Sequence, residues 1–182
     1  MGLSLMLLSD SDLISIRDSR SPLIVALEQV PSDSLTDVCR RALSIFTGVA
    51  AQEAPHFENT LRLMATSGDY DRLLSMIRES FTEFRYDDFP QLEGHYHDVL
   101  AVICGLLSDI VTDSSFRPGV VEWLLATGKG DLRIVFNLRG SAEEAAGKIT
   151  LKPEVPVSSV GVSFSAFDRR IDRWCPLFIK TN

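Results

Sequence analysis

The sequence contains no lysine over most of its length. Residues 1–128 hold nine Arg and 19 acidic residues but no Lys, which gives this part a net charge of −10. Residues 129–182 hold four Lys and five Arg against six acidic residues, a net charge of +3. Because an acidic chain repels polyanions unless its basic residues are strongly segregated, we do not expect nucleic acid as the principal partner.

Cysteine and long apolar stretches are also scarce. The three cysteines, Cys39, Cys104 and Cys175, are odd in number and widely spaced, which argues against a disulfide framework or a zinc module. The longest apolar run, 99–107, is about half as long as a membrane span. Residues 1–8 lack the basic start of a secretory signal. We expect a soluble, intracellular, cytoplasmic protein without a membrane span, metal or cofactor.

The first part of the chain has the period of amphipathic helices. Apolar residues recur every three or four positions after Ser32, after Pro55 and after Gly68. The stripe after Gly68 comprises Tyr70, Leu73, Leu74, Ile77, Phe81 and Phe84, and the stripe after Ser32 includes Cys39, Ala42 and Ile45. A fourth helix is predicted over 92–112, apolar on all sides and central to the core, and a last one from Pro118 to Gly128. The segment 22–30 fits either a strand or a short helix.

Beyond Gly130 the period changes from 3.6 to 2. Leu132, Ile134, Phe136 and Leu138 alternate with a second set, which predicts a half-buried strand; that set is Arg133, Val135, Asn137 and Arg139. Residues 141–144, Ser-Ala-Glu-Glu, have the pattern of a capping box that begins a short helix. Further strands are predicted over 148–152, 155–164 and 174–180. Pro176 restricts the last of these to a sheet edge or a bulge.

This order of elements predicts an α+β protein. About five helices in an N-terminal layer would pack on a C-terminal, mainly antiparallel sheet of about four strands, because the strands follow the helices as a run. We interpret 1–182 as a single domain, with 1–128 acidic and mainly helical and 129–182 basic and mainly strand. No linker separates the two parts: a helix that ends at Gly128 leads through 129–131 into the strand at Leu132.

Two glycine-containing segments only partly match catalytic motifs. Residues 127–131, Thr-Gly-Lys-Gly-Asp, lack the first glycine of a phosphate-binding loop and the Ser or Thr that follows its lysine. Residues 161–165, Gly-Val-Ser-Phe-Ser, lack the second glycine of a nucleophile elbow, and no histidine follows them. We reject both motifs and predict no catalytic residue.

The histidine-containing segment 95–98, His-Tyr-His-Asp, is the one alternative that favours catalysis. Residues i and i+2 of a helix point about 200° apart, so the two imidazoles would chelate a metal poorly. Helical metal motifs use the spacing i, i+4 instead. The alternative function is a small hydrolase-type enzyme in which His95 or His97 works with Asp98 or Glu93 as acid and base.

The densest basic cluster is 168–173, Asp-Arg-Arg-Ile-Asp-Arg, which precedes Trp174. It fits a solvated turn with internal ion pairs, a contact with an acidic protein surface, or a nucleic-acid-binding accessory protein that uses Arg169–Arg173. The candidate interaction residues are Arg133, Arg139, Arg169, Arg170, Arg173 and Trp174.

The charge division leads to the favoured function, which is binding and not catalysis. We expect a protein–protein interaction or assembly protein that acts through complementary acidic and basic surfaces, with another protein or a second copy as partner. The alternative is that the two parts neutralise each other within one molecule. Leu (23), Ser (20) and Arg (14), the residues with most codons, are abundant, which suggests a viral accessory or matrix-like protein.

Overall fold

The computed structural model describes residues 22–47, 49–82, 92–153, 156–164 and 171–179. Within these ranges, five α-helices precede five β-strands, and the 3₁₀-helix η3 lies between the third and fourth strands. The elements are α1 (Pro22–Glu28), α2 (Ser32–Phe46), α3 (Ala54–Ser67), α4 (Tyr70–Thr82), α5 (Leu92–Leu106), β1 (Val111–Arg117), β2 (Val120–Leu125), β3 (Leu132–Asn137), η3 (Glu143–Lys148), β4 (Ser158–Phe164) and β5 (Ile171–Leu177).

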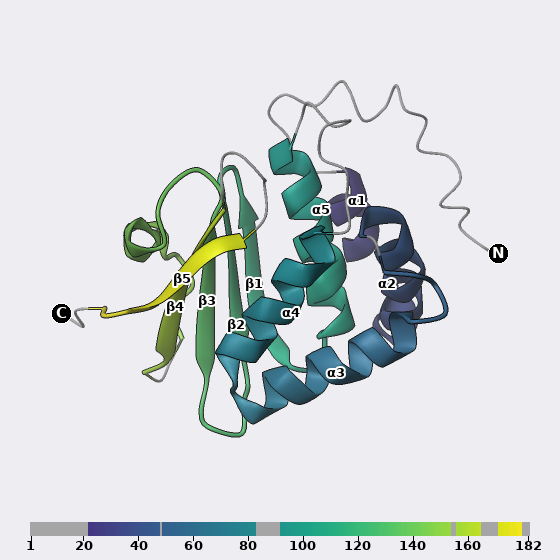
Figure 1. Ribbon diagram of the computed structural model, residues 1–182, viewed down its shortest axis with the longest axis horizontal. Coiled ribbons are helices and arrows are strands. Elements are labelled where there is room, and N and C mark those ends of the chain that lie inside the picture. The colour runs from purple at the N-terminus through teal and green to yellow at the C-terminus, as the bar shows by residue number, and fades with distance from the viewer. Residues whose placement is uncertain (1–21, 48, 83–91, 154–155, 165–170, 180–182) are drawn as a thin grey trace.

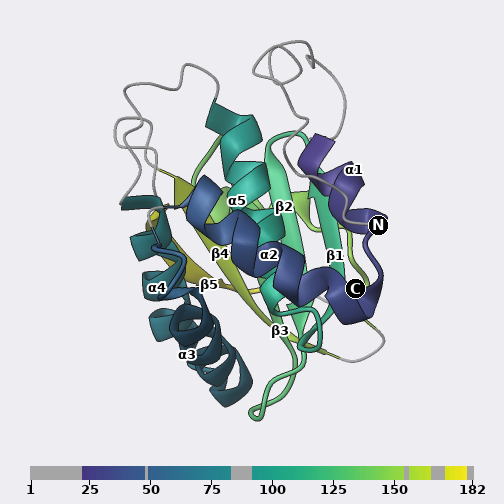
Figure 2. The same cartoon turned by 90° about the vertical axis from the view of Figure 1, so that its right-hand side faces the viewer.

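The strands form one sheet in the order β1-β2-β3-β4-β5. Every neighbouring pair is antiparallel except β3 and β4, which run parallel and are joined through η3. The helices cover one face of this sheet, and η3 lies on the other (Figures 1 and 2). The predicted α+β class, with helices first and a mainly antiparallel sheet after them, is confirmed. The sheet has five strands instead of about four.

The core lies between the helical layer and the sheet. The α4 stripe is confirmed, because Leu73, Leu74, Ile77 and Phe81 are all fully buried. Phe84 lies outside the described residues. The central position predicted for the fourth helix is also confirmed: α5 buries side chains around most of its circumference. The segment 22–30, which the sequence left open, forms the helix α1.

Helices α2 and α5 approach closely at a glycine. A Cβ atom at Gly105 would collide with Sγ of Cys39, so only a residue without a side chain allows this separation. Burial raises the pKa of Cys39 to about 12, and its neutral thiol packs as a small apolar group. The predicted burial of Ile45 on α2 is wrong, since 59% of this residue is exposed.

The helix predicted from Pro118 to Gly128 is wrong. Pro118 and Gly119 form the turn between β1 and β2, with Arg117 paired to Val120. Gly119 has φ of +76°, as the third residue of a type II turn requires. Helix α5 accordingly ends at Leu106, before the predicted limit of residue 112. The boundary between helices and strands therefore lies before residue 111, and residues 126–131 connect β2 to β3.

The face of the sheet opposite the helices is covered by the segment that contains η3. The capping box is confirmed: Ser141 N–H donates to Oε2 of Glu144 at 3.0 Å, and Glu144 N–H donates to Oγ of Ser141 at 3.2 Å. Ala145 packs against Val135. Gly161 of β4 allows a close approach, since a Cβ atom there would collide with the carbonyl oxygen of Ala142. Gly161 thus serves strand packing, not a nucleophile elbow.

This cover changes two predictions about the strands. Strand β3 has the predicted alternation, with Leu132, Ile134 and Phe136 in the main core, but it is buried on both faces and is not half-buried. Residues 148–152, predicted as a strand, end η3 and continue without strand pairing. The edge position predicted from Pro176 is confirmed, because β5 is the last strand of the sheet.

Among the described residues, no helix combines the length and apolar character that a membrane crossing requires.

Candidate functional site

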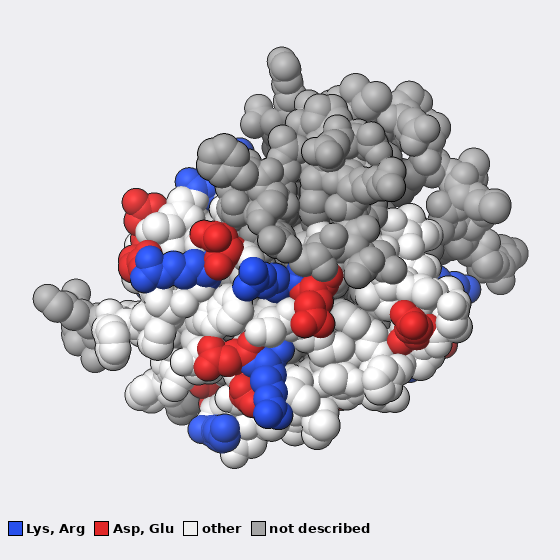
Figure 3. Space-filling view, in the orientation of Figure 1, with Lys and Arg blue, Asp and Glu red and all other residues white. Residues whose placement is uncertain are grey.

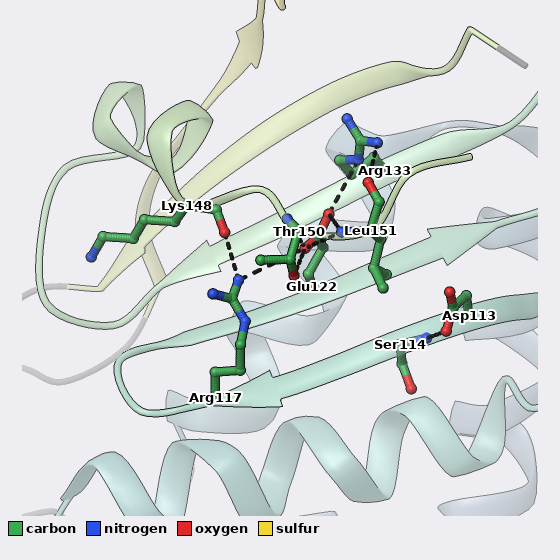
Figure 4. A network of polar contacts seen from close by, with 8 residues as sticks. All are labelled: Asp113, Ser114, Arg117, Glu122, Arg133, Lys148, Thr150 and Leu151. Atoms are coloured by element: carbon green, nitrogen blue, oxygen red, sulfur yellow. Dashed lines mark hydrogen bonds and ion pairs between the residues drawn. The ribbon is translucent and has the colours of Figure 1, made fainter. Parts of the chain in front are cut away.

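Of the candidate interaction residues, Arg133 is buried in a polar network on the outer face of the sheet (Figure 4). Its Nε lies 3.3 Å from Oε1 of Glu122, and its Nη2 donates to the carbonyl oxygen of Leu151 at 2.8 Å. Only 6% of the Arg133 side chain and none of the Glu122 side chain is exposed. Burial lowers the pKa of the Arg133 guanidinium, and Glu122 opposes that change. Arg133 therefore offers little surface to a partner.

The same carboxylate holds the segment that follows η3. Oε2 of Glu122 accepts hydrogen bonds from the backbone N–H of Thr150 at 2.9 Å and from its hydroxyl at 3.0 Å. The N–H of Leu151 also donates to Glu122. Arg117 lies 3.9 Å from Oε2 and donates to the carbonyl oxygen of Lys148 at 2.5 Å. Backbone and hydroxyl donors together with two arginines compensate the charge of this buried carboxylate. We infer a structural role for Glu122, which joins the segment after η3 to the sheet, and we call this arrangement the Glu122 clamp.

Arg139 forms an exposed ion pair that joins the sheet to the helical layer. Its Nε lies 2.5 Å from Oε2 of Glu93, in the first turn of α5. The other oxygen of Glu93 accepts a hydrogen bond from the N–H of Gly119 at 2.6 Å. The pair therefore links a basic residue of the second part of the chain to an acidic residue of the first.

The remaining described candidates lie on the edge strand β5. Nη2 of Arg173 lies 2.8 Å from Oε1 of Glu143, the first residue of η3. The indole N–H of Trp174 donates to Oδ1 of Asp71 at 2.7 Å, which fastens β5 to α4. Arg169 and Arg170 lie outside the described residues. The structure thus brings each described candidate to an acidic partner in the same chain, and it does not gather them in one basic patch.

Charges in the helical layer are also paired within the chain. The buried carboxylate of Glu58 on α3 contacts Arg40 of α2, and its other oxygen lies 2.9 Å from Nε of Arg62. Arg40 also pairs with Asp37, one turn earlier on α2, with 2.8 Å between Nη1 and Oδ1. On the face drawn in Figure 3, blue and red side chains lie in small mixed groups instead of two separate fields. On that face, the charge division along the sequence is not a division in space.

The two histidines of the alternative catalytic site lie on different sides of α5. Both belong to this helix, where a separation of two residues turns the side chains about 200° apart. His97 contacts the ring of Phe116 edge-on, with the ring centroids 6.4 Å apart. Burial lowers the pKa of His95 to about 4 and also lowers that of His97, whereas a general base at neutral pH needs a value near 7. Within the described ranges, no three His, Cys, Asp or Glu side chains are grouped as a metal site.

The candidate site that the structure adds is an open groove of about 590 Å³ between α3 and α4. Four half-buried apolar side chains border the groove and also pack against the main core: Val49, Phe57, Met64 and Met76. Polar and charged side chains complete its lining: Glu53, His56, Thr60, Arg72, Ser75 and Glu79. An apolar floor with a polar rim is the usual composition of a protein-binding surface.

Leu63 extends the apolar character to the rim of this groove. It follows His56 by seven residues and Thr60 by three, so it lies on the same side of α3 as these two lining residues. Its exposure is 63%. A single exposed apolar side chain is common on protein surfaces, so Leu63 contributes to this site only through its position beside the groove.

Sequence reasoning did not find this groove, although one signal was present. Met76 interrupts the polar side of α4, where Arg72, Ser75 and Glu79 lie off the buried stripe. The groove forms only where α3 and α4 pack side by side, and the sequence pattern does not specify how two helices pack. That arrangement follows from the two-residue connection at Gly68, whose φ of +68° ends α3.

No protein-family model matches the chain, and no curated protein or solved structure is significantly similar to it.

Proposed function

We propose that this chain is a non-enzymatic protein-binding protein that uses the groove between α3 and α4. The observation that carries the proposal is the groove floor, where Phe57, Met64 and Met76 are half-buried and open to solvent. Methionine side chains are flexible and polarizable, so they adapt to an apolar partner surface. The exposed Leu63 adds to the same surface.

The arginines favour a structural role over the charged interface expected from the sequence. Arg133 and Arg139 pair with Glu122 and Glu93, which lie in the acidic first part of the chain. These contacts support neutralisation between the two parts of one molecule. An interface at Arg173 or Trp174 stays a prediction, and such an interface would have to compete with the contacts that these residues make to Glu143 and Asp71.

Neither alternative function gains a supporting observation from the described residues. The hydrolase-type alternative requires His95 or His97, together with Asp98 or Glu93, to line a cleft, and the groove between α3 and α4 is instead lined by His56. The nucleic-acid reading depends on Arg169–Arg173, of which Arg173 pairs with a carboxylate. Replacement of both His95 and His97 by alanine, with an unchanged biological readout, would remove the enzymatic alternative.

Site-specific photocrosslinking in the native host tests the proposal. A photoreactive phenylalanine analogue at Thr60, inside the groove, is compared with the same analogue at Lys152, an exposed position on the opposite side of the sheet. We expect a discrete protein adduct from position 60 that is absent from position 152. Met76→Glu in the chain that carries the Thr60 analogue should abolish the adduct. Equal adducts from both positions, or none from position 60, would contradict the proposal.

A further inference from the structure

We infer that Asp113 keeps the edge strand β1 from pairing with a second copy of the chain. The carboxylate occupies a backbone donor that faces away from the sheet, and its charge opposes the approach of another β1 strand. This inference does not depend on the proposed function, because α4 is bonded to β5 and lies with α3 toward that edge of the sheet, opposite β1 (Figure 2).

Strand β1 presents an open edge. In the part of the chain that the structure describes, β1 pairs with β2 alone, and Thr112, Asp113 and Ser114 are exposed. The outer N–H and C=O groups of an edge strand can pair with a strand of another chain. A protein that stays monomeric therefore needs a feature that protects such an edge.

The register of the β1–β2 hairpin identifies the donors that face outward. Arg117 and Val120 flank the two-residue turn and pair with each other, so the hydrogen-bonding groups of Arg117 point toward β2. Because this direction alternates along a strand, the N–H groups of Phe116 and Ser114 point away from β2. These are the donors that an added strand would use.

Asp113 occupies one of these two donors. The N–H of Ser114 donates to Oδ1 of Asp113 at 2.8 Å, a contact that Figure 4 shows. An added strand would have to displace this carboxylate before it could accept the same hydrogen bond. The register also shifts between Val111 and Asp113, and a bulge at an edge disturbs the pairing of a further strand.

The charge of Asp113 opposes pairing with a second copy in particular. Two antiparallel β1 strands centred on Ser114 would carry their Asp113 side chains on one face as diagonal neighbours, about 7–8 Å apart. Two carboxylates at this spacing repel each other. The other residues of 111–116 are uncharged, and Val111, Thr112 and Phe116 are of types enriched in strands. Protection by charge therefore depends on Asp113.

Strand β5, the opposite edge, provides a matched control. Its register also shifts, and the exposed Asp172 is the extra residue between Ile171 and Arg173. Pro176 gives this edge a second protection, because it has no N–H to donate to an added strand. Loss of the Asp172 carboxylate should therefore leave β5 unpaired.

Light scattering over a range of protein concentrations tests the inference with Asp113→Ala, Asp113→Val and the control Asp172→Ala. The wild type and the control should have the mass of one chain. The Asp113 variants should rise to about twice this mass or more at both low and high salt, because salt does not screen backbone pairing, and the valine variant should associate more strongly. One-chain mass for both Asp113 variants, or equal association of the control, would overturn the inference.

Hydrogen exchange read by NMR then locates the contact. In the associated Asp113→Val variant, the N–H of Phe116 should exchange about tenfold more slowly than in the wild type. The N–H of Ser115, which faces β2, should change little. Circular dichroism should show the wild-type fold for both variants, because position 113 is exposed. Slower exchange confined to other elements would overturn the inference.

Discussion

The guanidinium of Arg133 on β3 lies 3.3 Å from the carboxylate of Glu122 on β2, with both side chains buried on the outer face of the sheet. This ion pair connects the two differently charged parts of the sequence. The Glu122 carboxylate also accepts hydrogen bonds from the backbone N–H groups of Thr150 and Leu151. It therefore fixes the segment that follows η3 to the outer face of the sheet.

Replacement of Glu122 by glutamine should destabilise the protein strongly. The change leaves Arg133 as a buried charge without its partner, and breaking a buried ion pair in this way costs about 3–5 kcal/mol. Guanidinium chloride denaturation measures the loss. The control is Glu143→Gln, which removes the exposed pair with Arg173 and should have a much smaller effect. Equal effects of the two substitutions would contradict a clamp at Glu122.

Replacement of Gly105 by alanine should destabilise the protein through a clash with Cys39. Overpacking of this kind costs about 1–3 kcal/mol. The second substitution Cys39→Ala removes the colliding sulfur, so the double variant should recover part of the loss in urea denaturation. Gly94 in the same helix is the matched control, because a Cβ there meets no atom within 4 Å. Gly94→Ala should instead be neutral or stabilising, since alanine favours helix.

The free energy of unfolding should fall as the pH decreases from about 6.5 to 4, in part because of His95. Burial lowers the pKa of His95 in the folded protein to about 4, whereas the unfolded chain has the ordinary value of 6.5. The unfolded chain therefore binds the proton first, and the stability present above pH 6.5 is lost toward pH 4. His95→Gln should flatten this dependence, measured by chemical denaturation at several pH values.

Light scattering at high protein concentration should give the mass of one chain at both low and high salt. We expect this because Arg133, Arg139 and Arg173 each have an acidic partner within the chain, which leaves fewer basic groups for pairing between copies. A mass that rises as the salt concentration is lowered would instead support self-assembly through complementary charges, since screening weakens exposed ion pairs.

Predictions that depended on local sequence were the accurate ones. The capping box at Ser141 and Glu144 forms because its partners are three residues apart. The stripe on α4 is buried because one helix face must meet the core. Pro176 lies on an edge strand because it has no N–H to donate to a second neighbour.

Predictions that depended on distant partners were less accurate. The segment 120–125 is short and apolar, so its periodicity does not separate a buried strand from a helix. Its pairing with β1 and β3 decides the outcome. The Pro118–Gly119 pair fits a hairpin turn, but a proline is also common at the first position of a helix, so the sequence alone favours the wrong element here.

The sequence by itself determined the α+β class, most of the helix faces and the edge strand, because periodicity, capping and proline act over a few residues. Only the tertiary structure decided the position of the charges. Arg133 looks exposed in an alternating strand, but the segment after η3 covers it and Glu122 neutralises it. The groove likewise exists only where α3 and α4 pack together. Burial and ion pairing depend on residues far apart in the chain, so no local pattern specifies them.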